Sequence, residues 1–344
     1  MATKSKVLLI NSIEGPAGLS FTELEPAQPG PGEVRIRVAA FALNRADLMA
    51  MSDTHYFVAQ LPSRLGWEAC GVVDAVGPGV QGVSIGDRVT AIPGTDFDHG
   101  TAGEFAIVLA RFLMAWPKSF TAVEATSLCM QAFTGYFPIV ELARTGPGDA
   151  VFITAGSSSA AIAAIQLARL QGAMVIAQTR SGEKADFIKR VGAHHVIASD
   201  HENIEQRLQD ITEGGGVRVV YDCYGGDFVQ KYIGALAPRA QIFIYGGMGG
   251  MQVQFPTLAL VRPGATLTGY SLINYVRTDE ELDRAKDFVG RAVENGHLRP
   301  VIDRVFSFDE TIDAYRYMQS GAQKGKIVVV VDSNLGGDSP PSVT

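Results

Sequence analysis

The stretch from Ala150 to Lys184 constrains the fold of this chain more than any other. It begins with an apolar, β-branched run at Val151–Thr154, which predicts a buried strand, and Met174–Gln178 predicts a second strand. Small polar residues after the first strand predict a tight turn, and the Ala- and Leu-rich segment from Ser159 predicts a helix that ends at Gly172. A strand, a helix and a strand in this order form a parallel βαβ unit with a right-handed crossover.

The turn between the first strand and the helix suits a phosphate group. A helix N-terminus offers free N–H groups and a partial positive charge, and small side chains let the backbone approach a pyrophosphate. The turn departs from G-x-G-x-x-G because only Gly156 is glycine, so a crossover that binds nothing is the alternative interpretation. We predict cofactor contacts in this turn at Ala155, Ser157, Ser158, Ser159 and Ala160.

The end of the second strand indicates which dinucleotide the turn would hold. Sites that select NAD usually carry an acidic residue there, which binds the ribose 2′-hydroxyl. Here the strand ends in Thr179 and Arg180, and Lys184 follows one turn later. Both cations could meet a 2′-phosphate, and a hydrogen bond to a charged group contributes about 1.5–3 kcal/mol. We therefore predict NADPH as the cofactor, with a solvated basic face, diluted by Glu183, as the alternative.

Composition excludes several other function classes. The chain has 344 residues, which suits two domains, and its formal net charge of −7 disfavours nucleic acid or an acidic membrane as a partner. Cys70, Cys129 and Cys223 lie far apart without a C-x-x-C pair, which is typical of a reducing compartment. No segment matches a membrane span or the apolar core of a signal peptide. We expect a cytoplasmic protein that acts on a small molecule.

The pattern of the chain changes near residue 126. Before it, short apolar runs such as Val34–Ala39 alternate with Gly/Pro turns, which predicts a barrel-like β domain. After it, predicted strands such as Val217–Tyr221 and Leu258–Gly269 alternate with helices such as Phe228–Leu236, which predicts a doubly wound parallel sheet. Ligands of such sheets sit beyond the C-terminal strand ends, where glycine-rich loops add four predicted cofactor residues: Cys223, Tyr245, Gly246 and Gly247.

These patterns divide the chain into four segments. We predict a first domain over residues 1–125, a cofactor-binding domain over 126–270, a return to the first domain over 271–332, and a disordered tail over 333–344.

Several segments occur in the order of one family's motifs: PGPGEVRIRVAAFALNRADL, LGWEACGVVDAVGPGVQGVSIGDRV, TGYFPIV, GAHHVI, VVYDCYGG and KGKIVVVV. Over about residues 5–332 the chain resembles the medium-chain dehydrogenase/reductase superfamily, and more narrowly its zinc-free quinone oxidoreductase branch. The resemblance implies an α/β protein with a GroES-like β-barrel catalytic domain and a Rossmann cofactor domain. It also implies a homodimer formed through the edge of the cofactor-domain sheet, at Thr257 to Gly269, where an exposed edge strand favours pairing.

The resemblance makes the question of a metal testable. The zinc-dependent branch binds its catalytic metal through two cysteines and a histidine, and alignment of the motifs puts Asn44, Trp67 and Met130 at those places. None of them is a good zinc ligand, and a catalytic zinc needs three ligands of the Cys, His or carboxylate type. Glu68 alone cannot hold the ion, so we predict that the chain binds no metal.

Without a Lewis acid, reactions that need only hydride delivery remain. Two acceptors fit, a quinone or an alkene conjugated to a carbonyl. The chemistry of short-chain dehydrogenases requires Tyr-x-x-x-Lys, and none of the ten tyrosines has a lysine four residues later. Two other functions stay open: an enoyl reductase acting on a carrier-bound or coenzyme-A thioester, and a non-catalytic NADPH-binding sensor or scaffold.

The resemblance also assigns individual residues. It implies that Asn44 lies beside the nicotinamide, that Thr134 lies near the nicotinamide ribose, and that Lys326 contacts the cofactor. Tyr56 follows in a segment like the family's Gly-x-Tyr; its hydroxyl could donate to a carbonyl or an enolate, or its ring could simply pack at the rim. Trp67 is expected to face the substrate, either stacking on it or filling the space of a metal.

Overall fold

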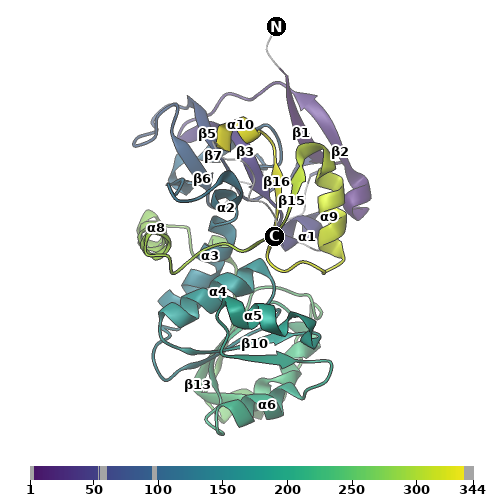
Figure 1. The fold of residues 1–344 in the computed structure, drawn as a ribbon, viewed down its shortest axis with the longest axis vertical. Helices are drawn as coiled ribbons and strands as arrows, with labels where there is room; N and C mark the ends of the chain where they lie inside the picture. The colour runs from purple at the N-terminus through teal and green to yellow at the C-terminus, as the bar shows by residue number, and fades with distance from the viewer. Residues whose placement is uncertain (1–3, 53, 55–59, 95–98, 337–344) are drawn as a thin grey trace. The chain divides into compact units, whose positions relative to one another are not determined.

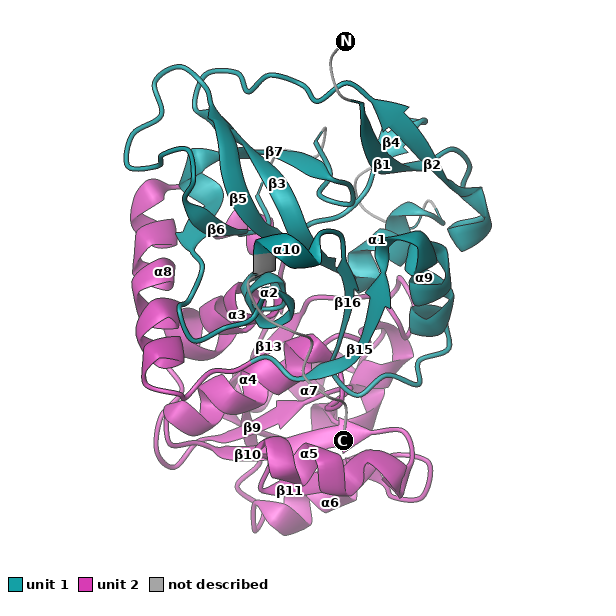
Figure 2. Ribbon diagram, turned by 45° about the horizontal axis from the view of Figure 1, so that its top comes forward, with its two compact units in different colours: residues 1–130, 300–344 teal, residues 131–299 magenta. Residues whose placement is uncertain are grey.

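The computed structural model describes residues 4–52, 54, 60–94 and 99–336. The chain divides into two compact units, residues 1–130 with 300–344 and residues 131–299, coloured teal and magenta in Figure 2. The return to the first unit therefore comes at residue 300, later than the predicted residue 271. The physical reason is helix α8 (Asp279–Glu294), which packs within the second unit: its Phe288 ring lies 5.1 Å from that of Tyr136, and its Arg284 pairs with Glu141 at 2.8 Å.

Unit 1 is built on one large, mostly antiparallel sheet. The strand order is β15-β16-β3-β5-β6-β8, with β7 also paired to β3. The strands are β3 (Glu33–Ala42), β5 (Ala69–Val76), β6 (Arg88–Ala91), β7 (Phe105–Leu109), β8 (Leu113–Ala115), β15 (Ile302–Ser307) and β16 (Lys326–Val330). Because Val328 of β16 lies opposite Ala42 of β3, the C-terminal segment completes this sheet, as the predicted return requires.

Smaller elements surround this sheet. Three strands form a second sheet, ordered β2-β1-β4: β1 (Ser5–Ile10), β2 (Leu19–Leu24) and β4 (Ser63–Arg64). The helices of unit 1 are α1 (Arg45–Ala50), α2 (Ala122–Thr126), α9 (Thr311–Gln319) and α10 (Ser333–Gly336). Helix α10 occupies the start of the predicted disordered tail, and the rest of that tail lies outside the described residues.

Unit 2 is a six-stranded sheet in which every pairing is parallel, ordered β11-β10-β9-β12-β13-β14. The strands are β9 (Ala150–Ile153), β10 (Met174–Thr179), β11 (His195–Ala198), β12 (Val217–Asp222), β13 (Leu236–Ile244) and β14 (Thr266–Gly269). Numbered along the chain from β9, this is the order 3-2-1-4-5-6, so the topological switch point lies between β9 and β12. The predicted doubly wound parallel sheet is confirmed.

Helices cover both faces of this sheet, as Figure 1 shows for α4, α5 and α6. The helices of this part of the chain are α3 (Cys129–Tyr136), α4 (Ser159–Leu170), α5 (Ala185–Val191), α6 (Ile204–Ile211), α7 (Thr257–Val261) and α8. Such cover explains why all four residues of β9 are buried, because a parallel sheet is enclosed on its two faces.

Two predicted elements of unit 2 differ in the structure. The segment Leu258–Gly269 was predicted as one more strand after Pro263-Gly264; β14 is that strand, but the residues before the break form the short helix α7, because Leu258, Ala259 and Leu260 are good helix formers. The predicted helix Phe228–Leu236 is two short 3₁₀ segments, Gly226–Lys231 and Ile233–Ala235. Glycine at 234 disfavours a longer helix there.

Candidate functional site

The turn after β9 is fixed against β10 by one side chain, Gln178. The buried Gln178 side chain accepts a hydrogen bond from the Ala155 N–H (3.0 Å) through Oε1 and donates one to Ser199 Oγ (2.9 Å) through Nε2. The Gly156 N–H donates to the Gln178 carbonyl at 2.7 Å, and a Cβ on Gly156 would lie 3.0 Å from that of Ala177. The turn therefore has one backbone shape, set by close approach to the neighbouring strand.

Helix α4 begins directly after this turn. Ser158 is its N-cap residue, and its Oγ accepts a hydrogen bond from the Ala161 N–H at 3.3 Å. Ser157, Ser159 and Ala160 are partly exposed around the cap. The first turn of a helix presents N–H groups that lack intrahelical partners and favours an anion. The predicted phosphate-binding residues thus lie at one helix start, at the C-terminal end of β9.

The end of β10 presents the predicted basic residues. Thr179 is buried, Arg180 is exposed, and Lys184 is partly buried in a single 3₁₀ turn, Gly182–Lys184. Burial raises the pKa of Tyr224, and the charge of Arg180 opposes that rise, so the guanidinium lies near the loop after β12. The strand that neighbours the predicted phosphate-binding turn therefore ends without a carboxylate at its tip, and Glu183 lies between the two cations that follow.

Asp222, at the end of β12, ties two strand ends together. Its buried carboxylate accepts hydrogen bonds from the Thr154 and Tyr232 hydroxyls, at 3.1 and 2.8 Å, and from two backbone N–H groups. These N–H groups belong to Tyr224, at 2.8 Å, and Gly225, at 3.2 Å. Burial raises the pKa of Asp222 and these hydrogen bonds oppose the rise. Because Thr154 follows β9 and Tyr224 and Gly225 follow β12, Asp222 links the loops at the two strand ends of the switch point.

Cys223, after β12, packs closely against the glycine-rich loop that follows β13. The Cys223 N–H donates to Thr154 Oγ1 at 2.9 Å. Burial raises the pKa of the Cys223 thiol to about 12, so the side chain is a neutral packing group rather than a nucleophile. A Cβ on Gly246 would lie 2.4 Å from the Cys223 carbonyl oxygen. The Tyr245 ring stacks on Tyr221 with centroids 4.1 Å apart, while Gly247 lies next to Gly246 in the same loop.

Two further predicted residues lie elsewhere in the chain. Thr134 is buried in helix α3. Trp67 is partly buried and directly precedes Glu68 in unit 1. Tyr56, the predicted proton donor, lies outside the described residues.

Unit 1 contains a buried polar cluster that sequence analysis did not assemble, formed by Asn44, Glu68 and Lys326. The Lys326 ammonium forms an ion pair with Glu68 and donates to Asn44 Oδ1 at 2.7 Å. The Asn44 amide donates to Glu68 Oε1 at 3.1 Å and to the Ala42 carbonyl at 3.2 Å. The other Glu68 oxygen accepts from the Met130 N–H at 2.9 Å. Lys326 was predicted to contact the cofactor, but its charge is used inside unit 1.

Asp47 adjoins this cluster. Its Oδ2 accepts from the Asn44 backbone N–H at 2.7 Å, and within the part of the chain that the structure describes its Oδ1 has no hydrogen-bond partner. Burial raises the pKa of Asp47 to about 7, although the Asn44 N–H, the Lys326 charge and the Tyr315 hydroxyl oppose the rise. Asp47 is therefore a structural hydrogen-bond acceptor with a raised pKa, near neutral pH.

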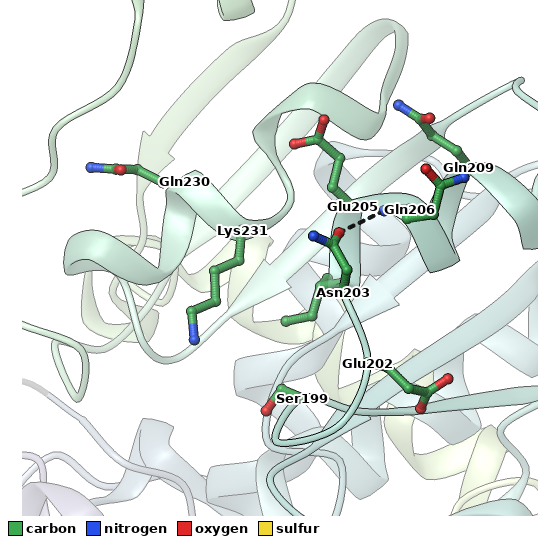
Figure 3. Close-up of a pocket in the computed structure, with 9 residues that line it drawn as sticks. Ser199, Glu202, Asn203, Glu205, Gln206, Gln209, Gln230 and Lys231 are labelled. Atoms are coloured by element: carbon green, nitrogen blue, oxygen red, sulfur yellow. Dashed lines mark hydrogen bonds between the residues drawn. The ribbon is translucent and has the colours of Figure 1, made fainter.

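A separate polar pocket of about 460 Å³ opens beside the N-terminus of α6 (Figure 3). It is lined by Ser199, Glu202, Asn203, Ile204, Glu205, Gln206, Gln209, Gln230 and Lys231. The Asn203 side chain that faces it caps α6 by accepting from the Gln206 N–H at 2.9 Å. None of the predicted cofactor residues lines this pocket, although its Ser199 directly follows β11 and accepts the hydrogen bond from Gln178.

Comparison with known proteins agrees with this architecture. The family model described as "Alcohol dehydrogenase GroES-like domain" matches residues 30–118, and the one described as "Zinc-binding dehydrogenase" matches residues 161–289. A 2-haloacrylate reductase from Burkholderia is 29% identical over 94% of this chain and 98% of its own length. A quinone oxidoreductase from Pseudomonas aeruginosa is 28% identical over 92% of this chain and 96% of its own.

A solved structure extends the similarity to the whole fold. The quinone oxidoreductase of Escherichia coli, crystallised with NADPH, superposes with a TM-score of 0.86 at 25% identity, covering 95% of this chain and all of its own. The predicted combination of a GroES-like and a Rossmann domain is therefore confirmed. Among the described residues, no helix is both long and apolar enough to cross a membrane.

The residues at the zinc positions do not fit a metal ion. The amide oxygen of Asn44, which is the atom that could bind a metal ion, accepts a hydrogen bond from the Lys326 ammonium, and the neighbouring Glu68 is engaged by Lys326 and by the Met130 N–H. Across the described residues no three His, Cys, Asp or Glu side chains form a group that would hold an ion. The charged partner of Glu68 is the ammonium of Lys326.

Proposed function

This chain is an oxidoreductase of the medium-chain dehydrogenase/reductase superfamily, in its quinone oxidoreductase-like branch, and from this we propose that it uses NADPH to reduce a quinone or an alkene conjugated to a carbonyl. The observation that carries the proposal is the C-terminal edge of the unit 2 sheet. A helix start, two glycine-rich loops and two cations lie there, at the switch point of a doubly wound sheet. Two relatives are named for the acceptors in question, a quinone and a 2-haloacrylate.

Each strand-end segment has a proposed part in binding. The turn Ala155–Ala160 holds the pyrophosphate through backbone N–H groups at the start of α4. Arg180 and Lys184 bind the 2′-phosphate, which NADH lacks. Cys223, Tyr245, Gly246 and Gly247 line the groove beside them. Thr134 contacts the nicotinamide ribose.

The proposed hydride transfer requires few catalytic side chains. The bound dinucleotide supplies the hydride, and the protein orients it and excludes water. We propose that Asn44 orients the nicotinamide, that Trp67 packs against the acceptor, and that Tyr56 donates a proton to the developing oxyanion. We propose that no metal takes part, because the residues at the zinc positions offer poor ligands.

We also propose that the protein is a homodimer joined along β14. This strand is one of the two edge strands of the unit 2 sheet, the other being β11, and an unpaired edge favours pairing with its own copy. The neighbouring helix α7 exposes large apolar side chains, Leu258 at 57% and Val261 at 62%. The double variant L258E/V261E is expected to be monomeric by light scattering. If L258E/V261E had the same molar mass in solution as the wild type, this interface would be refuted. We propose a cytoplasmic location, since the three buried cysteines are free thiols.

The test is oxidation of NADPH by the purified protein, followed by absorbance with phenanthrenequinone and, in parallel, with a simple enone. Each acceptor is tried with NADPH and NADH, and with and without a chelator. Turnover that prefers NADPH and resists the chelator is expected, and the better acceptor identifies the substrate class. Activity lost with the chelator would overturn the metal-free proposal. NADPH binding without turnover would favour the enoyl-thioester reductase or the non-catalytic sensor.

A further inference from the structure

The Asn44 side chain has very little hydrogen-bonding capacity left for a ligand. A primary amide has two N–H donors and a carbonyl oxygen with two lone pairs. Both donors are used, at 3.1 Å on Glu68 Oε1 and 3.2 Å on the Ala42 carbonyl, and one lone pair accepts from Lys326 at 2.7 Å. The hydrogen bonds of the described residues therefore leave one lone pair on Oδ1.

The surrounding charges hold the amide in this orientation. Reversing it would turn Oδ1 toward the Glu68 carboxylate and the Ala42 carbonyl, and would turn Nδ2 toward the Lys326 ammonium. Each of the three contacts would then become repulsive. Glu68 and Lys326 are 0% and 1% exposed, so water screens these interactions weakly, whereas Asn44 itself is 7% exposed. The charged pair is enclosed and the amide it orients is the most accessible member of the cluster.

We propose that Lys326, paired with Glu68, is a positioning residue that makes Asn44 an acceptor-only contact, and that the group it accepts from is the carboxamide N–H of the nicotinamide ring. This inference rests on the proposed function, since it requires a bound nicotinamide. It assigns Lys326 an indirect part in recognition, through the amide of Asn44, rather than direct contact with the cofactor.

The test compares NADPH with its reduced acetylpyridine analogue, in which a methyl ketone replaces the carboxamide and so keeps the acceptor but loses the donor. Dissociation constants are measured by the fluorescence of the reduced ring, without turnover. The wild type is expected to bind the analogue about tenfold more weakly, the loss of one hydrogen bond of about 1.4 kcal/mol. In E68Q/K326M the ratio is expected to fall toward one, because the introduced glutamine can offer Asn44 its oxygen or its nitrogen and the amide is free to reverse.

The double variant is chosen because K326M alone leaves the Glu68 charge buried and unpaired, which threatens folding. K6M is the matched control: Lys6 also pairs with a carboxylate, Asp309, but at an exposed position, and its ratio should equal that of the wild type. A ratio of one in the wild type, or a wild-type ratio retained in E68Q/K326M, would overturn the proposal.

A second measurement separates failure of this inference from failure of the proposed function. In the NMR spectrum of the free protein, the Asn44 side-chain N–H₂ group, assigned through its loss in N44D, should exchange slowly with solvent, and faster in E68Q/K326M. If NADPH does not bind at all, the proposed function and the carboxamide contact fail. Slow exchange would still support the fixed orientation, whereas fast exchange in the wild type would overturn it.

Discussion

The two units bury polar groups in opposite ways. In unit 1 the cluster around Asn44 contains full charges, with Lys326 between Glu68 and Asn44 and the Asp47 carboxyl beside them. In unit 2 the carboxyl of Asp222 is surrounded by neutral donors, two hydroxyls and two backbone N–H groups. Charges fix the direction of one side-chain amide, while neutral hydrogen bonds fix the path of two loops.

This difference matches what each unit is proposed to present. A phosphate group is held by backbone N–H groups, so unit 2 needs loops of defined shape and no buried cation. A nicotinamide carboxamide has a donor side and an acceptor side, so unit 1 needs an amide that cannot reverse. Both tryptophans, Trp67 and Trp116, lie in unit 1, so their fluorescence follows that unit's unfolding separately.

The largest expected effect is on unit 1 when its ion pair is broken. K326M leaves Glu68 buried without its cation and should lower the free energy of unfolding of unit 1 by about 3–5 kcal/mol. E68Q/K326M removes both charges and should recover most of that loss. Urea titrations followed by tryptophan fluorescence measure both. Equal stability of K326M and the wild type would mean that the pair is unimportant to the fold.

Sequence analysis could predict elements whose cause is local. The β9–α4–β10 unit followed from apolar periodicity and a small-residue turn, and the structure contains it with ends shifted by a residue or two. The stretch 258–265 was misjudged because apolar Leu, Ala and Val residues occur in short helices and in strands alike. Tertiary packing decides between the two, and the local sequence pattern does not contain that information.

The candidate site was less predictable because its contacts join distant residues. Asn44 and Lys326 are 282 positions apart, and only the pairing of β16 with β3 brings them together. Lys326 was therefore assigned to the cofactor on the basis of a motif, although its ammonium lies inside unit 1. Gln178 was predicted only as part of a strand, and its hydrogen bond to the turn became evident from the register of β10 beside β9.

The next effect concerns pH and again separates the units. The folded pKa of Asp47 is raised from 3.8 to about 7, so the protonated carboxyl is favoured in the folded state, and its contribution is present at low pH and lost as pH rises through that window. Between pH 5 and 8 the wild type should lose about 3 kcal/mol of unit 1 stability relative to D47N. Parallel pH profiles of the two proteins would show that Asp47 does not titrate in this range.

A third effect should touch binding and leave the fold alone. Arg180 is exposed at the end of β10, so R180A should weaken NADPH binding about 10- to 100-fold while NADH binding and unfolding stay unchanged. R190A, an exposed arginine of α5, is the matched control. Equal losses for the two dinucleotides would place Arg180 away from the 2′-phosphate. The charge of Arg180 would then contribute neither to selective binding of NADPH nor to the stability of unit 2.

The smallest effect concerns the backbone of the turn in unit 2. Ala155 has a φ of 49°, a left-handed conformation that costs an L-residue about 1–2 kcal/mol. Glycine removes this strain but makes the unfolded chain more flexible, so A155G should stabilise unit 2 by a net of about 0.5–1 kcal/mol. G156A is the opposite case, because its Cβ would lie 3.0 Å from Ala177 Cβ and 3.2 Å from the Gln178 carbonyl oxygen, forcing the turn away from β10. Hydrogen exchange of peptides covering β9 and β10 measures both variants. Slower exchange in A155G and faster exchange in G156A would show that the stability of unit 2 depends on the shape of this loop, whereas that of unit 1 depends on charge. Destabilisation by A155G would mean instead that the contacts of the Ala155 methyl group stabilise the fold by more than the backbone strain costs.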